Sequence, residues 1–203
     1  FKRFAALFSL ILVYQAVPMA VALLEQYVIR TSMSARDSAG YYMASRFSDF
    51  LFYLTFPLLI VSFPYTALSR GRRSRMKYVL VCSAITLAVA LTAAALYVFC
   101  GSRLLSLMPN GGKYAEYAFL MPHLTLAAAL TSVQVFTTNA EVSAGSFGFF
   151  KWFIPLHAAY AAAFAFAAHL QSFETPSDIL VWFWVIAVAR AVFSLMMIFR
   201  SKL

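Results

Sequence analysis

The chain has 203 residues, of which 63% are hydrophobic and only 11% are charged, and its mean hydropathy is +0.80. Soluble domains are about 45–50% apolar and about 25% charged, so this composition excludes an ordinary soluble domain and predicts an integral membrane protein. The formal net charge is +9. Most of the basic residues lie in short segments between apolar runs, where they orient a membrane protein and contact anionic lipid headgroups. A nucleic-acid partner is therefore not expected.

Six apolar runs predict six membrane-spanning helices. Five of them carry no charge and are 20 to 25 residues long, and the sixth is interrupted only by Arg190. About 20 helical residues cross the ~30 Å hydrocarbon core, and helices satisfy their own backbone groups in lipid. The expected fold is all-α and polytopic, with helices at about 4–29, 39–69, 77–102, 115–140, 149–172 and 177–200.

The loop charges predict an orientation. If the spans alternate, one side of the membrane holds ten Lys and Arg residues and the other holds five. Excess Lys and Arg stay cytoplasmic, so both ends of the segment are expected on the cytoplasmic side of the inner membrane. The cluster RGRRSRMK, 70–77, contributes most of this bias. We interpret it as a topology determinant that also contacts anionic lipid; the alternative is a binding site for a regulatory partner.

Five charged residues lie in the stretch RTSMSARDSAGYYMASRFSDF, 30–50, whereas the apolar runs on both sides of it carry almost no charge. Asp37 and Ser38 are capping residues, and a helix from Ala39 to 69 would be about 45 Å long, more than the hydrocarbon core needs. Arg46 and Asp49 then share one helix face, near or inside the outer half of the membrane. Ionisable residues at that depth should face a watery cavity or a partner, which predicts a polar cavity wall.

Four further residues are candidates for the same cavity. Glu25 lies near the outer end of the first span, where a role in the turn is the alternative to binding a cation. Arg190 lies near the middle of the last span; a central Arg costs about 2.5–3.5 kcal/mol on insertion scales, so a partner or water is expected. Gln134 and Asn139 in the fourth span are weaker candidates, with interhelical hydrogen bonds as the alternative.

Motifs of enzymes and metal sites are absent from the sequence. There is no Walker A sequence, no H-E-x-x-H and no Cys/His cluster with zinc spacing. His157 and His169 are twelve residues apart, which is not the spacing of two ligands on one helix. No paired carboxylates have a spacing that suggests acid/base catalysis. We therefore expect a protein that is not an enzyme and has neither a metal site nor a cofactor.

Three segments resemble one family of transporters. EQYVIRTSMSARDSAGYYMASRF (25–47) has an acidic residue near a helix end, a polar turn and Ala-Gly-Tyr opening a long helix. LLSLMPNGGKYAEYAFLMPHL (104–124) and AEVSAGSFGFFKWFIP (140–155) follow in order. Together they resemble the polysaccharide flippases of the multidrug/oligosaccharidyl-lipid/polysaccharide (MOP) exporter superfamily, over nearly the whole chain. Two positions depart from the family pattern. The family often has Asp where this chain has Glu25, and it has a Phe-Gly pair where this chain has Asn110-Gly111.

The resemblance implies a fold and a function. The chain would be the carboxy-terminal six-helix lobe of a two-lobed transporter, whose amino-terminal lobe is a partner missing from this chain. Such proteins move undecaprenyl-diphosphate-linked oligosaccharides across the cytoplasmic membrane by alternating access, for cell-surface polysaccharide biosynthesis. A coupling ion, H+ or Na+, is the one small cofactor that this implies. Arg suits phosphate oxygens, so Arg46 is the first candidate for the diphosphate, and an Arg46–Asp49 pair that stabilises the helix is the alternative.

Other functions stay open at the level of sequence. A lipid II flippase or a multidrug exporter of the same superfamily would share the fold. A membrane-embedded glycan transferase or ligase would act on related lipids, but such enzymes are expected to carry a large catalytic loop outside the membrane. The longest outer connection here is 30–49, part of which is predicted to be helical. This favours the transporter over the enzyme, and a purely structural bundle protein is the remaining alternative.

Overall fold

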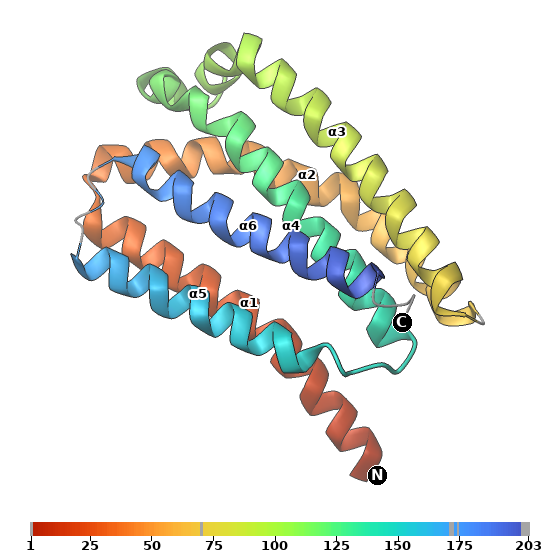
Figure 1. The fold of residues 1–203 in the computed structure, drawn as a ribbon. Helices are drawn as coiled ribbons and strands as arrows, with labels where there is room; N and C mark the ends of the chain where they lie inside the picture. Colours follow the sequence, from red (N-terminus) through yellow and green to blue (C-terminus); the bar gives the residue numbers. More distant parts are fainter. Residues whose placement is uncertain (1, 70, 171–172, 174, 200–203) are drawn as a thin grey trace.

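The computed structural model describes residues 2–69, 71–170, 173 and 175–199. All regular elements in these ranges are helices, which confirms the predicted all-α class. Among the described residues, five stretches are long and apolar enough to cross a membrane, as in a polytopic membrane protein: Ala35–Leu68, Arg72–Ser106, Gly111–Ser143, Phe150–Leu170 and Pro176–Phe199. The elements are α1 (Lys2–Ser32), α2 (Ala35–Leu68), α3 (Arg72–Ser106), the 3-10 helix η1 (Gly111–Phe119), α4 (Leu120–Ser143), α5 (Phe150–Leu170) and α6 (Pro176–Phe199) (Figure 1).

Each predicted span overlaps at least one of these helices. The first predicted span lies within α1, a helix of 31 residues. At about 1.5 Å per residue, the 34 residues of α2 and the 35 of α3 exceed the length needed to cross the hydrocarbon core. Residue 200, at the end of the last predicted span, and the basic residues Arg70 and Lys202 lie outside the described residues.

The start of α2 corrects one prediction. The N-cap residue is Ser34, whose Oγ accepts a hydrogen bond from the backbone N–H of Asp37 at 3.1 Å. Ser38 lies inside the helix, and its hydroxyl donates to the Ile29 carbonyl of α1 at 3.0 Å. The prediction that Asp37 and Ser38 cap a helix starting at Ala39 is therefore wrong. Ser34 and Asp37 have the three-residue spacing of a capping box, so the helix begins four residues earlier.

The predicted span 115–140 is divided between η1 and α4. Pro122 is the third residue of α4, and it has no N–H to donate to the carbonyl of Ala118. A proline is tolerated in the first turn of an α-helix, where the N–H groups have no partner within the helix. The α-helix accordingly begins at Leu120, and the residues before it form a 3-10 helix.

The helices form two groups. α4 contacts α2, α3 and α6, and the candidate span that it forms with η1 has the largest buried share of the five. α1 and α5 run side by side as a separate pair, with few contacts between α1 and α2 (Figure 1). One large hydrophobic core joins the two groups through Ile29, Tyr41, Leu120, Phe164 and Ile179. A smaller cluster of α5 and α6 residues around Phe153 and Phe193 connects them further along.

A buried ion pair fixes one end of the α4-centred group. Nε of Arg72, at the start of α3, donates to Oε1 of Glu141 at 3.0 Å. Nη2 of Arg72 donates to the carbonyl oxygen of Met197 in α6 at 2.8 Å. The Glu141 side chain is only 3% exposed. Since a buried carboxylate needs a charged partner, this contact ties together the start of α3 and the ends of α4 and α6.

Candidate functional site

A polar pocket of about 440 Å³ lies between α1, α2, α4 and α6. Its ionisable lining residues are Glu25 of α1, Arg46 and Asp49 of α2, and Arg190 of α6. Four of the six site residues expected from the sequence thus surround one pocket, although Glu25 and Arg190 are 165 residues apart. The volume falls in the range of about 300–1,000 Å³ that is typical of small-molecule sites.

The remaining lining combines hydrogen-bonding groups with aromatic rings. Tyr41 stacks on Phe183 at the pocket wall, with ring centroids 5.8 Å apart. Small alanines of α1 and α4 leave space between the helices. This mixture suits a ligand that carries both hydroxyl groups and anionic groups. The other lining residues are Ala22, Gln26, Ile29, Tyr42, Ser45, Ser48, Phe52, Leu124, Ala127, Ala128, Thr131 and Ile186.

A hydrogen bond between α1 and α5 fixes the Glu25 side chain. The hydroxyl of Tyr160, on α5, donates to Glu25 Oε1 at 2.8 Å. Tyr160 is only 6% exposed, so this bond lies inside the bundle and fixes one carboxylate oxygen. In the sequence, Tyr160 is the one hydroxyl-bearing residue between the two histidines of the tract HAAYAAAFAFAAH. A single hydroxyl group in an otherwise apolar tract indicates a specific polar contact, and the sequence analysis did not identify Tyr160.

Arg46 and Asp49 form a loose, exposed pair. Nη1 of Arg46 lies 3.8 Å from Oδ2 of Asp49, and the two side chains are 72% and 49% exposed. An exposed pair at this distance contributes little to stability. The Arg46–Asp49 pair of the alternative interpretation therefore exists, and the guanidinium still has most of its donors available to a ligand, so the contact with a diphosphate stays a prediction.

Arg190 lines the pocket from α6. It lies 14 residues into α6, within the apolar part of the helix, and its Nη1 is 3.4 Å from Oγ1 of Thr131 on α4. The Thr131 hydroxyl in turn donates to the carbonyl of Ala127 at 3.1 Å. An ionisable residue at this depth is expected to face a partner or a polar cavity, and Arg190 has both. Thr131 was not identified from the sequence, where nothing distinguishes it from the other hydroxyl residues of α4.

Gln134 and Asn139 do not line this pocket. Gln134 lies on α4, three residues beyond Thr131; it is 4% exposed, and its Nε2 has no hydrogen-bond partner among the described residues. Asn139 is half-buried further along α4. His157 is fully buried on α5, and its Nδ1 lies 2.8 Å from the Phe153 carbonyl oxygen. Across the described ranges, no cluster of His, Cys, Asp and Glu is arranged to hold a metal ion.

Comparisons with protein-family models, with curated proteins and with solved structures find no match to this chain. The resemblance to the MOP exporters therefore rests on the sequence segments alone and stays a hypothesis. The geometry adds a separate observation. Two guanidinium groups and two carboxylates, on three helices of the bundle, surround a pocket with hydroxyl and aromatic groups.

Proposed function

We propose that this chain is the carboxy-terminal lobe of a flippase that moves undecaprenyl-diphosphate-linked oligosaccharides across the cytoplasmic membrane by alternating access. In this proposal both ends of the segment face the cytoplasm and the missing amino-terminal lobe supplies the other half of the passage. The polar pocket is the part of this lobe that receives the diphosphate and the first sugars.

One observation carries the proposal, namely the convergence of Arg46 and Arg190 on a single pocket. Arginine donates several hydrogen bonds in a planar fork that matches phosphate oxygens. An apolar bundle retains ionisable residues at this depth when they serve a polar passage or pair with one another. Two arginines on different helices can hold a diphosphate from two sides.

The two arginines have different parts in the proposed mechanism. Arg46 is mostly exposed and only loosely paired, so a phosphate oxygen can replace the Asp49 carboxylate at little cost. Arg190 lies deeper along α6 and stays anchored to Thr131. Glu25 and Asp49 are then available to accept hydrogen bonds from sugar hydroxyls, and Tyr41 and Phe183 provide an aromatic surface for a sugar ring.

Alternating access also requires helices that change their relative positions. The α1–α5 pair carries Glu25 and Tyr160, whereas the α4-centred group carries Arg46, Asp49 and Arg190. The pocket therefore lies at the boundary between the two groups, so a shift of one group would open or close it. This arrangement supports a transport function over a purely structural one.

The experiment is a flipping assay with the whole protein in proteoliposomes and a fluorescent undecaprenyl-diphosphate oligosaccharide. We expect Arg46→Ala to abolish flipping while the amount of protein in the membrane is unchanged, because the diphosphate loses its first charged contact. Arg103→Ala is the matched control, since Arg103 is an exposed arginine of α3 outside the pocket, and it should keep the wild-type rate.

Three outcomes would contradict the proposal. Normal flipping by Arg46→Ala would remove Arg46 from the mechanism. Transport of cationic amphiphiles without transport of the lipid-linked glycan would favour a multidrug exporter. Transfer of the glycan to an acceptor, with no flipping, would favour a membrane-embedded transferase.

A further inference from the structure

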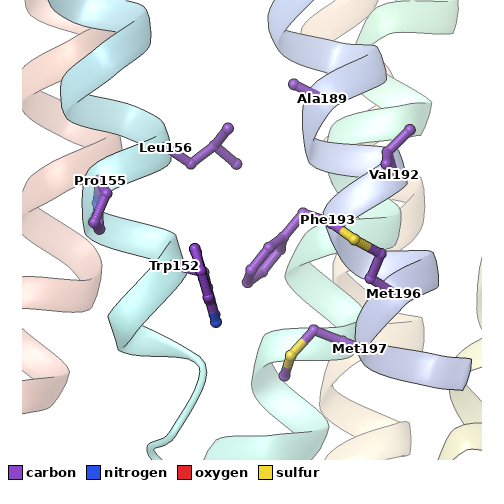
Figure 2. Close-up of a pocket in the computed structure, with 8 residues that line it drawn as sticks. All are labelled: Trp152, Pro155, Leu156, Ala189, Val192, Phe193, Met196 and Met197. Carbon is purple, nitrogen blue, oxygen red and sulfur yellow. The ribbon is translucent and has the colours of Figure 1, made fainter. Parts of the chain in front are cut away.

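A second pocket, of about 720 Å³, opens between α5 and α6 and is largely apolar (Figure 2). Trp152 and Leu156 of α5 point across it toward Phe193 of α6 (Figure 2). None of its lining residues is ionisable, in contrast to the polar pocket. We refer to it as the apolar groove; its lining residues are Trp152, Pro155, Leu156, Ala189, Val192, Phe193, Met196 and Met197.

The apolar groove and the polar pocket share one face of α6. Phe183, Ile186 and Arg190 line the polar pocket, and Phe193 and Met197 line the groove. The successive spacings are three, four, three and four residues, which places all five side chains on one stripe of the helix. Arg190 and Met197 are seven residues apart, or about 10 Å along the axis. Arg190, the one ionisable residue of this stripe, therefore lies within about two turns of both groove residues.

The facing helix α5 shows the same proximity. Leu156 lines the groove, and Tyr160, one turn further, donates its hydrogen bond to Glu25 of the polar pocket. On both helices, a residue that lines or contacts the wall of the polar pocket, Arg190 or Tyr160, thus lies about one turn from a residue of the apolar groove. A molecule that fits both regions at once has an anionic head and an apolar tail.

We propose that the apolar groove holds the tail of the same lipid whose diphosphate occupies the polar pocket. This inference rests on the proposed function. The tail already lies in an apolar medium, so the groove adds little driving force over the bilayer. Its role is positional, because it lets the tail leave the bundle toward lipid while the headgroup stays between Arg46 and Arg190. A bulk phospholipid has its headgroup at the membrane surface and does not need a groove next to a pocket that contains two arginines.

The test is photo-cross-linking of the full chain in phosphatidylcholine nanodiscs. The probe is an undecaprenyl diphosphate with a diazirine on an isoprene unit near the head. We expect labels on peptides 152–156 and 189–197. Arg190→Gln should reduce these labels about tenfold, because the head is no longer held. A phosphatidylcholine with the same diazirine in its acyl chain should show no such dependence on Arg190.

A steric variant tests the groove separately from the pocket. Ala189→Trp places a large ring in the groove and should reduce groove labelling about tenfold. Ala162→Trp is the matched control on an exposed position of α5, and it should keep the wild-type labelling. Neither variant should change the affinity for inorganic pyrophosphate, measured by calorimetry, by more than about twofold, because the head contacts are intact.

The outcomes separate this inference from the proposed function. Pyrophosphate binding that depends on Arg190, together with labels that fall outside the groove, would overturn the inference and leave the proposed function standing. Groove labelling that is equal for both lipids and insensitive to Arg190→Gln would show a general lipid contact and would also overturn it. A lack of binding for both pyrophosphate and the lipid probe would count against the proposed function itself.

Discussion

At the scale of single residues, the chain uses its ion pairs in two ways. Arg46 and Asp49 are 3.8 Å apart and largely exposed, whereas Arg72 and Glu141 are 3.0 Å apart with Glu141 almost fully buried. The first pair gains little from its geometry and can exchange its partner for a ligand. The second is embedded in the packing of three helices, where loss of one partner leaves an uncompensated charge.

This difference predicts the effect of removing Arg72. Arg72→Met should lower the free energy of unfolding by about 3–5 kcal/mol, because the buried Glu141 carboxylate loses its only described ion-pair partner. Arg73→Met is the control, since Arg73 is exposed on the same helix turn, and surface changes of this kind stay within about 0.5 kcal/mol. Thermal or denaturant unfolding of the purified protein in detergent provides the measurement.

A second variant tests the cause. If the cost arises from the unpaired carboxylate, Glu141→Leu in the Arg72→Met background should restore most of the lost stability, because two apolar partners replace the ion pair. A double variant as unstable as Arg72→Met alone would show that Arg72 acts through its bond to the Met197 carbonyl instead.

At the scale of elements, the contact between α2 and η1 depends on one glycine. A Cβ atom added at Gly40 would fall on the ring of Tyr117. That ring is 7% exposed, and its hydroxyl donates to Oδ1 of Asp37 at 2.6 Å. The ring cannot move away without disturbing this hydrogen bond, so Gly40 sets the distance between the start of α2 and η1.

We therefore expect Gly40→Ala to destabilise the protein by about 1–3 kcal/mol through overpacking, although alanine is the better helix former. Gly112→Ala is the matched control, because a Cβ there meets no atom within 4 Å. Unfolding midpoints of the two variants in the same detergent provide the comparison. A Gly40→Ala protein as stable as wild type would mean that Tyr117 is free to shift.

The elements themselves were largely predictable from the sequence, because lipid imposes a simple rule on them. A long run without charges has to be helical to satisfy its backbone groups, and all six predicted spans overlap observed helices. The ends were less predictable. The α2 cap at Ser34 was missed although Ser34 and Asp37 have capping-box spacing, and the 3-10 helix before Pro122 has no hydropathy signal, since it is part of a longer apolar run.

At the scale of the whole molecule, the arrangement of the helices decides which polar residues meet. Hydropathy identified Glu25, Arg46, Asp49 and Arg190 as exceptions in apolar surroundings, and the fold places all four at one pocket. Gln134 was selected for the same reason and does not line it. The sequence could not separate these cases, because a position on a helix face gains a partner only through packing between helices. Tyr160 and Thr131 were missed for the same reason.

The central claim is that the pocket is a polar passage that admits an anionic ligand. The most direct measurement compares two engineered cysteines of α4 in nanodiscs, in a background without Cys82 and Cys100. Ala128 lines the pocket, whereas Leu130, likewise half-buried on the same helix, does not. We predict that Ala128→Cys reacts with a negatively charged thiol reagent and that undecaprenyl diphosphate protects it, while Leu130→Cys stays unreactive. Equal reactivity at both positions, or no protection at Ala128→Cys, would contradict the account.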